Sequence, residues 1–172
     1  MSPPYFAYGS NLLASRLEAR VGPVRVLGTA VLAGFELAWN KPGQDGSGRA
    51  NLRPRPGALC RGALYALRPD QWRVLDTFEP GYRREGHLVR GGDGREIEAT
   101  LYRYETTSPD LAPHADYLRL VLEGAREHRL AAPIASPARL EPEVPGVAAV
   151  VVLEHVLGDQ DLVDFVGTIR QA

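Results

Sequence analysis

The start of the chain carries polar groups that could bind an anionic ligand. A short aromatic and apolar run, residues 5–8, is followed by Gly9, Ser10 and Asn11 directly before a helical segment. A strand that turns sharply into a helix leaves several backbone N–H groups unpaired and directed at one point, which suits a carboxylate or a phosphate. Gly9 would let the backbone approach a ligand closely or adopt a positive φ. The same pattern also fits a plain turn in which Ser10 or Asn11 caps the helix.

A carboxylate at a predicted helix end could act as a general acid or base. Glu79 follows Phe78 and precedes Pro80-Gly81-Tyr82, so the helix must stop there. Aromatic and proline neighbours would partly desolvate the carboxylate and raise its pKa toward the range of a general base. A solvated glutamate at a helix C-terminus is the alternative, although the helix dipole disfavours a negative charge at that end.

The sequence lacks the other common catalytic motifs. Its four histidines are scattered without ligand spacing and Cys60 is the only cysteine, so zinc binding and an intrachain disulfide have no support. Gly9-Ser10 lacks the frame of a hydrolase nucleophile elbow, and neither a P-loop nor a dinucleotide-binding glycine motif is present. Cys60 fits a small core residue or a reactive thiol beside Arg61. We therefore expect no metal and no cofactor.

The composition indicates one folded domain without a nucleic-acid or membrane partner. The chain has 172 residues, of which 44% are hydrophobic and 24% charged, and its formal net charge is −1. That length can bury a sizeable core, and the charge gives no electrostatic case for nucleic acid or an anionic membrane. No signal-peptide pattern and no apolar run near the ~20 residues of a membrane span occur, so a cytoplasmic location is expected. Lys41, the only lysine, has no role that the pattern assigns.

Many short strands with a few helices predict an α+β fold. Period-2 patterns and turn signals predict strands over 5–9, 50–54 and 60–67, two more over 24–40 joined near Ala33-Gly34, and a hairpin over 82–89 and 96–104. Helical spacing predicts helices over 12–20, 70–78 and 114–128. Loops or turns are expected at 42–48 and 54–57, a proline-rich surface segment at 131–146, a strand or buried helix at 147–156 and a capped helix at 159–170.

Taken together, these residues resemble the γ-glutamylcyclotransferase family. Four segments match the family in order: Tyr5 to Leu12, Arg61 to Leu67, Leu75 to Tyr82 with Glu79 at the expected position, and Tyr117 with the helix end Gly124 to Glu127. The resemblance implies a mixed β-barrel with flanking helices, in a single domain over residues 1–172. The tail over 136–172 lies outside the match and is expected to form a C-terminal extension packed on or near the domain. Its apolar stretch could cover a barrel edge or form the contact of a homodimer.

The resemblance also implies an activity and its residues. A γ-glutamyl amide would be converted to 5-oxoproline with release of the amine, Glu79 acting as the catalytic acid and base. The tyrosine-glycine-serine loop would hold the glutamyl head group, and two later tyrosines would contact the substrate. The substrate-binding residues implied in this way are Tyr5, Phe6, Ala7, Tyr8, Gly9, Ser10, Asn11, Tyr102 and Tyr117. Tyr104 faces the same way as Tyr102 and competes with it for this assignment.

The implied reaction closes a five-membered ring within the substrate. The α-amine attacks the γ-carbonyl of the same molecule, so holding the substrate in the attack pose supplies much of the rate. Free α-amino groups titrate near ~8, so a base must remove a proton, and Glu79 could then protonate the leaving amine. Two alternatives stay open: a cyclotransferase that deprotects a γ-glutamyl biosynthetic intermediate, and a non-catalytic small-molecule-binding module on the same fold.

Overall fold

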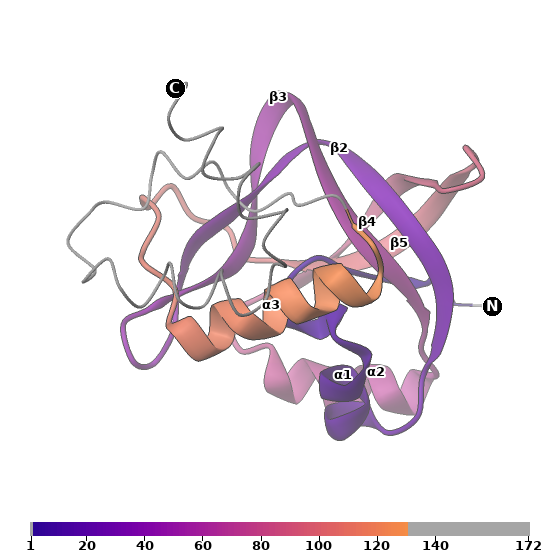
Figure 1. The fold of residues 1–172 in the computed structure, drawn as a ribbon, viewed down its shortest axis with the longest axis horizontal. Helices are drawn as coiled ribbons and strands as arrows, with labels where there is room; N and C mark the ends of the chain where they lie inside the picture. The colour runs from indigo at the N-terminus through magenta and orange to yellow at the C-terminus, as the bar shows by residue number, and fades with distance from the viewer. Residues whose placement is uncertain (1, 131–172) are drawn as a thin grey trace.

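A closed five-stranded barrel dominates the computed structural model of the protein, which describes residues 2–130 (Figure 1). Its strands are β1 (Tyr5–Ala7), β2 (Arg25–Pro42), β3 (Gly48–Ala66), β4 (Arg83–Gly91) and β5 (Glu96–Arg103). The order around the barrel is β1-β3-β2-β4-β5, and every pair is antiparallel except β1 with β5, where Tyr5 lies opposite Thr100. The predicted α+β fold, a mixed β-barrel with flanking helices, is confirmed.

Helices flank the barrel on the side that carries the site. A 3-10 turn (Ser10–Leu12) leads into α1 (Ala14–Val21), and α2 (Pro69–Phe78) lies beside α1 below the barrel (Figure 1). The third helix, α3 (Ala115–Glu127), packs against the 3-10 turn. Its Gly124 permits that approach, because a Cβ there would lie only 2.4 Å from the backbone nitrogen of Leu13. This contact fixes the turn after β1 against α3.

The two longest strands are each continuous, which corrects part of the sequence prediction. Residues 24–40 were expected to hold two strands, but β2 runs through Gly34, which has a φ of 80° and lies at a register shift. The turn expected at 54–57 is likewise a bend within β3, which continues from Gly48 to Ala66. Pairing with β2 resumes on both sides of the bend, where Phe35 pairs with Pro54 and Ala33 pairs with Leu59. A bulge that contains a glycine with positive φ lets a strand bend and continue. The turns predicted at 33–34 and 54–57 are therefore wrong.

A second irregularity in β2 lies next to the site. Ala38 pairs with Asn51 and Lys41 pairs with Arg49, so two residues of β2 lie opposite the single residue Ala50 of β3. Such a bulge leaves backbone groups without ladder partners and re-aims the following side chains. The loop expected at 42–48 is short and ordered: Pro42 ends β2, Gly48 begins β3, and a turn closed by a 2.8 Å hydrogen bond joins them.

The structure also tests the predictions for the hairpin, for α3 and for Cys60. The hairpin of β4 and β5 and the helix α3 are confirmed close to their predicted bounds. Cys60 is 1% exposed, and burial raises the pKa of its thiol to about 12, which fits a core residue rather than a reactive thiol. Within residues 2–130, no helix is long and apolar enough to cross a membrane. The segments predicted at 131–146, 147–156 and 159–170, and the extension over 136–172, lie outside the described residues.

Candidate functional site

Two neighbouring cavities open beside the loop that follows β1. The outer cleft has a volume of about 410 Å³ and the inner cavity about 30 Å³, and Ser10, Glu79, Tyr82 and Tyr117 line both. The inner cavity is further lined by Tyr5, Tyr8, Gly9, Asn11, Ala50 and Tyr102. Predicted site residues from four parts of the chain, namely the loop after β1, Glu79, Tyr102 and Tyr117, therefore lie around one space.

Phe6 and Ala7 do not reach this space. Both are fully buried in the barrel core, and neither lines the outer cleft or the inner cavity. Alternation along β1 explains the difference for Phe6, because Tyr5 and Phe6 point to opposite faces of the strand. Ala7 lies opposite Ala63 on β3, where its small side chain belongs to the core. These two residues support the loop by packing.

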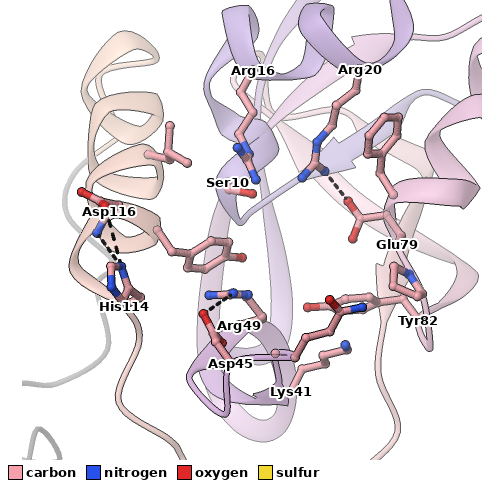
Figure 2. A pocket seen from close by; sticks show the side chains of 16 residues that line it. Ser10, Arg16, Arg20, Lys41, Asp45, Arg49, Glu79, Tyr82, His114 and Asp116 are labelled. Carbon is pink, nitrogen blue, oxygen red and sulfur yellow. Dashed lines mark hydrogen bonds and ion pairs between the residues drawn. The ribbon is translucent and has the colours of Figure 1, made fainter.

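Glu79 points its carboxylate at the loop after β1. It is the residue at which α2 ends, and its side chain is 14% exposed. Its Oε1 accepts a hydrogen bond from Asn11 Nδ2 at 2.9 Å. The same oxygen accepts an ion-pair hydrogen bond from Arg20 Nη1 at 3.0 Å (Figure 2). The alternative of a solvated glutamate at a helix end does not fit this burial.

Asn11 joins the loop to the carboxylate and does not cap a helix. Its amide nitrogen also donates to the Tyr5 hydroxyl at 3.0 Å, and its amide oxygen accepts from Arg20 at 3.0 Å. The residue at the N-cap of α1 is Leu13, which makes no side-chain capping bond, and the turn Ser10–Leu12 is uncapped as well. The alternative of a plain capped turn is therefore wrong, and the polar side chain of Asn11 is used within the site.

Opposing effects act on the Glu79 carboxyl. Burial raises its pKa above the ordinary value for glutamate, while the Arg20 charge and the hydrogen bonds from Asn11 and Arg20 act to lower it. The result is a carboxyl with a raised pKa that still has a cation 3.0 Å away. Burial also raises the pKa values of the Tyr5 and Tyr8 phenols, so both remain protonated. A carboxyl of raised pKa thus lies between one cationic donor, Arg20, and neutral phenols.

Two tyrosine hydroxyls hold the backbone of Ala50 at the bulge. Tyr117 accepts from the Ala50 N–H at 3.2 Å, and Tyr82 donates to the Ala50 carbonyl at 2.7 Å. Gly9 lies against the same residue, because a Cβ at Gly9 would come within 2.8 Å of Ala50 Cβ. Gly9 has a φ of −112°, so of the two uses considered for this glycine the positive φ does not occur, and close packing on β3 explains the residue.

Tyr102 turns its hydroxyl toward α2. The Tyr102 hydroxyl donates to Asp76 Oδ1 at 2.7 Å, and the Tyr8 hydroxyl donates to the Tyr102 carbonyl. Asp76 also accepts from Arg84 and carries the carbonyl that bonds the Glu79 N–H. Tyr102 therefore lines the inner cavity with its ring while its hydroxyl ties β5 to the end of α2.

Four cations line the outer cleft, and the sequence analysis did not place them there. Arg16 and Arg20 enter from α1, whereas Lys41 and Arg49 face them from the β2–β3 end (Figure 2). The spacing of four residues between Arg16 and Arg20 on a predicted helix was a usable signal, since it puts both on one helix face. Lys41 lies at the end of β2 and Arg49 at the start of β3, on either side of the predicted loop, and nothing in the sequence placed that end of the hairpin opposite α1.

Comparisons with known proteins agree with this geometry. Residues 5–119 match the family model described as gamma-glutamyl cyclotransferase, AIG2-like. The gamma-glutamylcyclotransferases of Bos taurus and Homo sapiens are each 28% identical over 136 residues, which is 73% of this chain and 71% of theirs. The crystal structure of an uncharacterized human protein has a TM-score of 0.68 at 23% identity, covering 86% of this chain and 98% of that one. A gamma-glutamyl cyclotransferase structure has a TM-score of 0.66 at 22% identity, covering 87% and 99%.

Proposed function

The chain belongs to the gamma-glutamyl cyclotransferase, AIG2-like family, and from that premise we propose that it cyclises the γ-glutamyl group of a γ-glutamyl amide to 5-oxoproline and releases the amine. Glu79 carries this proposal. It is a carboxyl of raised pKa that faces the loop after β1 from the end of α2, inside a cavity wide enough on its outer side for a substrate. Burying a carboxylate is costly even when it is paired, as Glu79 is with Arg20 and Asn11, so stability alone does not favour one here.

The loop after β1 and α1 supply the groups that would hold the glutamyl head. The first N–H groups of a 3-10 turn have no partners within the turn, and those of Ser10 and Asn11 are in this position. The Arg16 guanidinium lines the same side of the cleft. These N–H groups and the guanidinium suit the α-carboxylate of the substrate. A substrate bound in this way would have its α-amine near Glu79.

Proton transfer by Glu79 would then drive two steps. As a carboxylate it removes a proton from the α-ammonium, and the freed lone pair of the amine attacks the γ-carbonyl carbon. As a carboxylic acid it returns the proton to the amide nitrogen, the carbonyl re-forms as the carbon–nitrogen bond breaks, and the amine leaves. The ring nitrogen gives its second proton to the carboxylate so formed, which passes it to the departing amine. The hydrogen bond from Asn11 and the ion pair with Arg20 hold the carboxylate for both steps. Because the attack is intramolecular, positioning contributes much of the acceleration.

Product analysis tests the proposed function. The purified protein is incubated with several γ-glutamyl dipeptides and with glutathione, and 5-oxoproline and the released amine are quantified together. The proposal expects both products in equal amounts from at least one substrate. Binding of a γ-glutamyl compound, measured by calorimetry, without any 5-oxoproline would instead support the non-catalytic binding module. A γ-glutamyl biosynthetic intermediate belongs in the same assay, because the deprotecting alternative uses identical chemistry on a different amine.

A further inference from the structure

Lys41 lines the outer cleft but has no role in the proposed mechanism. It lines the outer cleft beside Arg49 and Tyr82, on the side away from α1 (Figure 2). The bulge between Ala38 and Lys41 sets this position, because it changes the direction of the side chains at the end of β2. A lysine is also the exception in this chain, whose other basic side chains are all arginines.

Aromatic rings hold the Lys41 ammonium in place. Its Nζ lies 5.5 Å from the ring centroid of Tyr82 and 5.8 Å from that of Tyr104, within the range of cation–π attraction. Its recorded hydrogen bond goes to the neighbouring Pro42 carbonyl at 3.0 Å. An ammonium has three N–H donors, so donors remain for a ligand. Among residues 2–130, no carboxylate lies within 4.0 Å of it.

The other cations of the cleft differ in whether their charge is already neutralised. Arg20 pairs with Glu79, and Arg49 pairs with Asp45 at 3.0 Å. Hydrogen bonds from Ser47 and Arg49 lower the pKa of Asp45 to about 2, so that pair is fully charged at neutral pH. Arg16 makes no ion pair within the described residues, and its Nε is buried without a hydrogen-bond partner. Two unneutralised cations, Arg16 and Lys41, thus face the cleft from opposite sides.

These two cations fit two negative groups on one substrate. Arg16 lies on the side of Ser10, where the glutamyl carboxylate is placed by the proposed function, and Glu79 lies between that side and Lys41 (Figure 2). A γ-glutamyl amide that presents its amine to Glu79 must extend its leaving part away from α1. That direction leads toward Lys41 and Arg49.

We propose that Lys41 forms a subsite for a negative group on the released amine, so that it selects γ-glutamyl amides whose leaving part carries a carboxylate over those with a neutral or cationic amine. This inference rests on the proposed function and refines it. The neighbouring Arg49, although paired with Asp45, adds positive potential on the same wall. A cationic amine would meet two like charges there, so the subsite disfavours γ-glutamyl amides that release one.

Matched substrates test the subsite. We compare γ-glutamyl-alanine with γ-glutamyl-alanine amide, which lacks only the carboxylate charge, in the unmodified protein and in the variants Lys41→Met and Lys41→Arg. Loss of a charge-assisted hydrogen bond is expected to raise KM for γ-glutamyl-alanine about tenfold in Lys41→Met. KM for the amide should stay within about twofold, and Lys41→Arg should recover most of the preference. Arg95→Met, at a side chain that is 84% exposed, controls for the loss of one positive charge.

Each outcome has a distinct meaning. An equal loss for both substrates in Lys41→Met would place Lys41 against the glutamyl group and overturn the subsite. A preference that Lys41→Met leaves unchanged would overturn it as well, while the proposed function would stand because both substrates are turned over. Absence of 5-oxoproline from both substrates and from the dipeptide panel with the unmodified protein would overturn the proposed function and the subsite together. Circular dichroism of each variant establishes that the comparison is made between folded proteins.

Discussion

Arg20 and Glu79 form a partly buried ion pair at 3.0 Å, and the same Arg20 nitrogen donates to Asn11 at 3.0 Å. Both side chains of the pair are at most 16% exposed. The arrangement joins α1 to the end of α2, and it places a cation next to the Glu79 carboxylate, which lines the inner cavity. Burial raises the pKa of Glu79 and the Arg20 charge acts to lower it, so Arg20 favours the ionised form that the proposed base requires.

Replacing Arg20 by methionine is expected to shift the pH dependence of catalysis. Removing the positive charge while Glu79 stays buried raises the Glu79 pKa further, because an opposite charge at this distance favours the ionised form. A base works only when deprotonated, so the acidic limb of kcat/KM against pH should move to higher pH by about one unit. The exposed variant Arg95→Met should leave the limb in place. An acidic limb that does not move in Arg20→Met would contradict the role given to this pair.

Replacing Asn11 by leucine should destabilise the fold. The substitution removes hydrogen bonds to Tyr5, Glu79 and Arg20 at a position that is 4% exposed, and it leaves buried polar groups without partners. We expect a loss of about 1–3 kcal/mol in the free energy of unfolding, measured by urea denaturation. Ser15→Ala, on the exposed face of α1, should change that free energy by less than about 0.5 kcal/mol. Equal stabilities of the two variants would show that the Asn11 amide is dispensable.

Gly9 and Ala50 form a packing pair that a double substitution can test. The added Cβ in Gly9→Ala would lie 2.8 Å from Ala50 Cβ, so β3 must shift where Tyr82 and Tyr117 bind it. We expect a loss of about 1–3 kcal/mol in the free energy of unfolding, together with reduced activity. In Gly9→Ala/Ala50→Gly the clashing carbon is gone, and both losses should be largely recovered. A double variant as impaired as Gly9→Ala would mean that the glycine serves something other than this contact.

The fold was predicted correctly where hydrophobic residues recur with a regular period, and wrongly where a strand bends at a single glycine. The hairpin of β4 and β5 and the helix α3 follow directly from period-2 and period-3.6 spacing. Gly34 and Gly57 read as turn residues, yet both have a φ near 80° inside continuous strands. A positive φ serves a bulge as well as a turn, and the partner strand that decides between them is distant in sequence.

The sequence named several of the residues that line the two cavities but none of the contacts between them. The loop after β1 and Glu79 could be named from the sequence, and the structure brings them within one hydrogen bond across 68 positions. The residues next to Asn11 do not show whether its side chain binds Glu79 or caps a helix, because either arrangement provides hydrogen-bond partners for the side-chain amide. Lys41 lines the cleft because of a bulge in β2, which depends on pairing with β3.

The central claim is that Glu79 exchanges the protons of the cyclisation, and Glu79→Gln tests it most directly. Glutamine keeps an oxygen that can accept from Asn11 and Arg20, so the thermal unfolding midpoint and calorimetric binding of a γ-glutamyl dipeptide should be largely preserved. Removing the acid–base group should lower kcat for 5-oxoproline formation by about 10²- to 10⁴-fold. Glu127→Gln, on a helix end that lines neither cavity, is the matched control and should keep its rate. Turnover in Glu79→Gln at the rate of the unmodified protein would contradict the account.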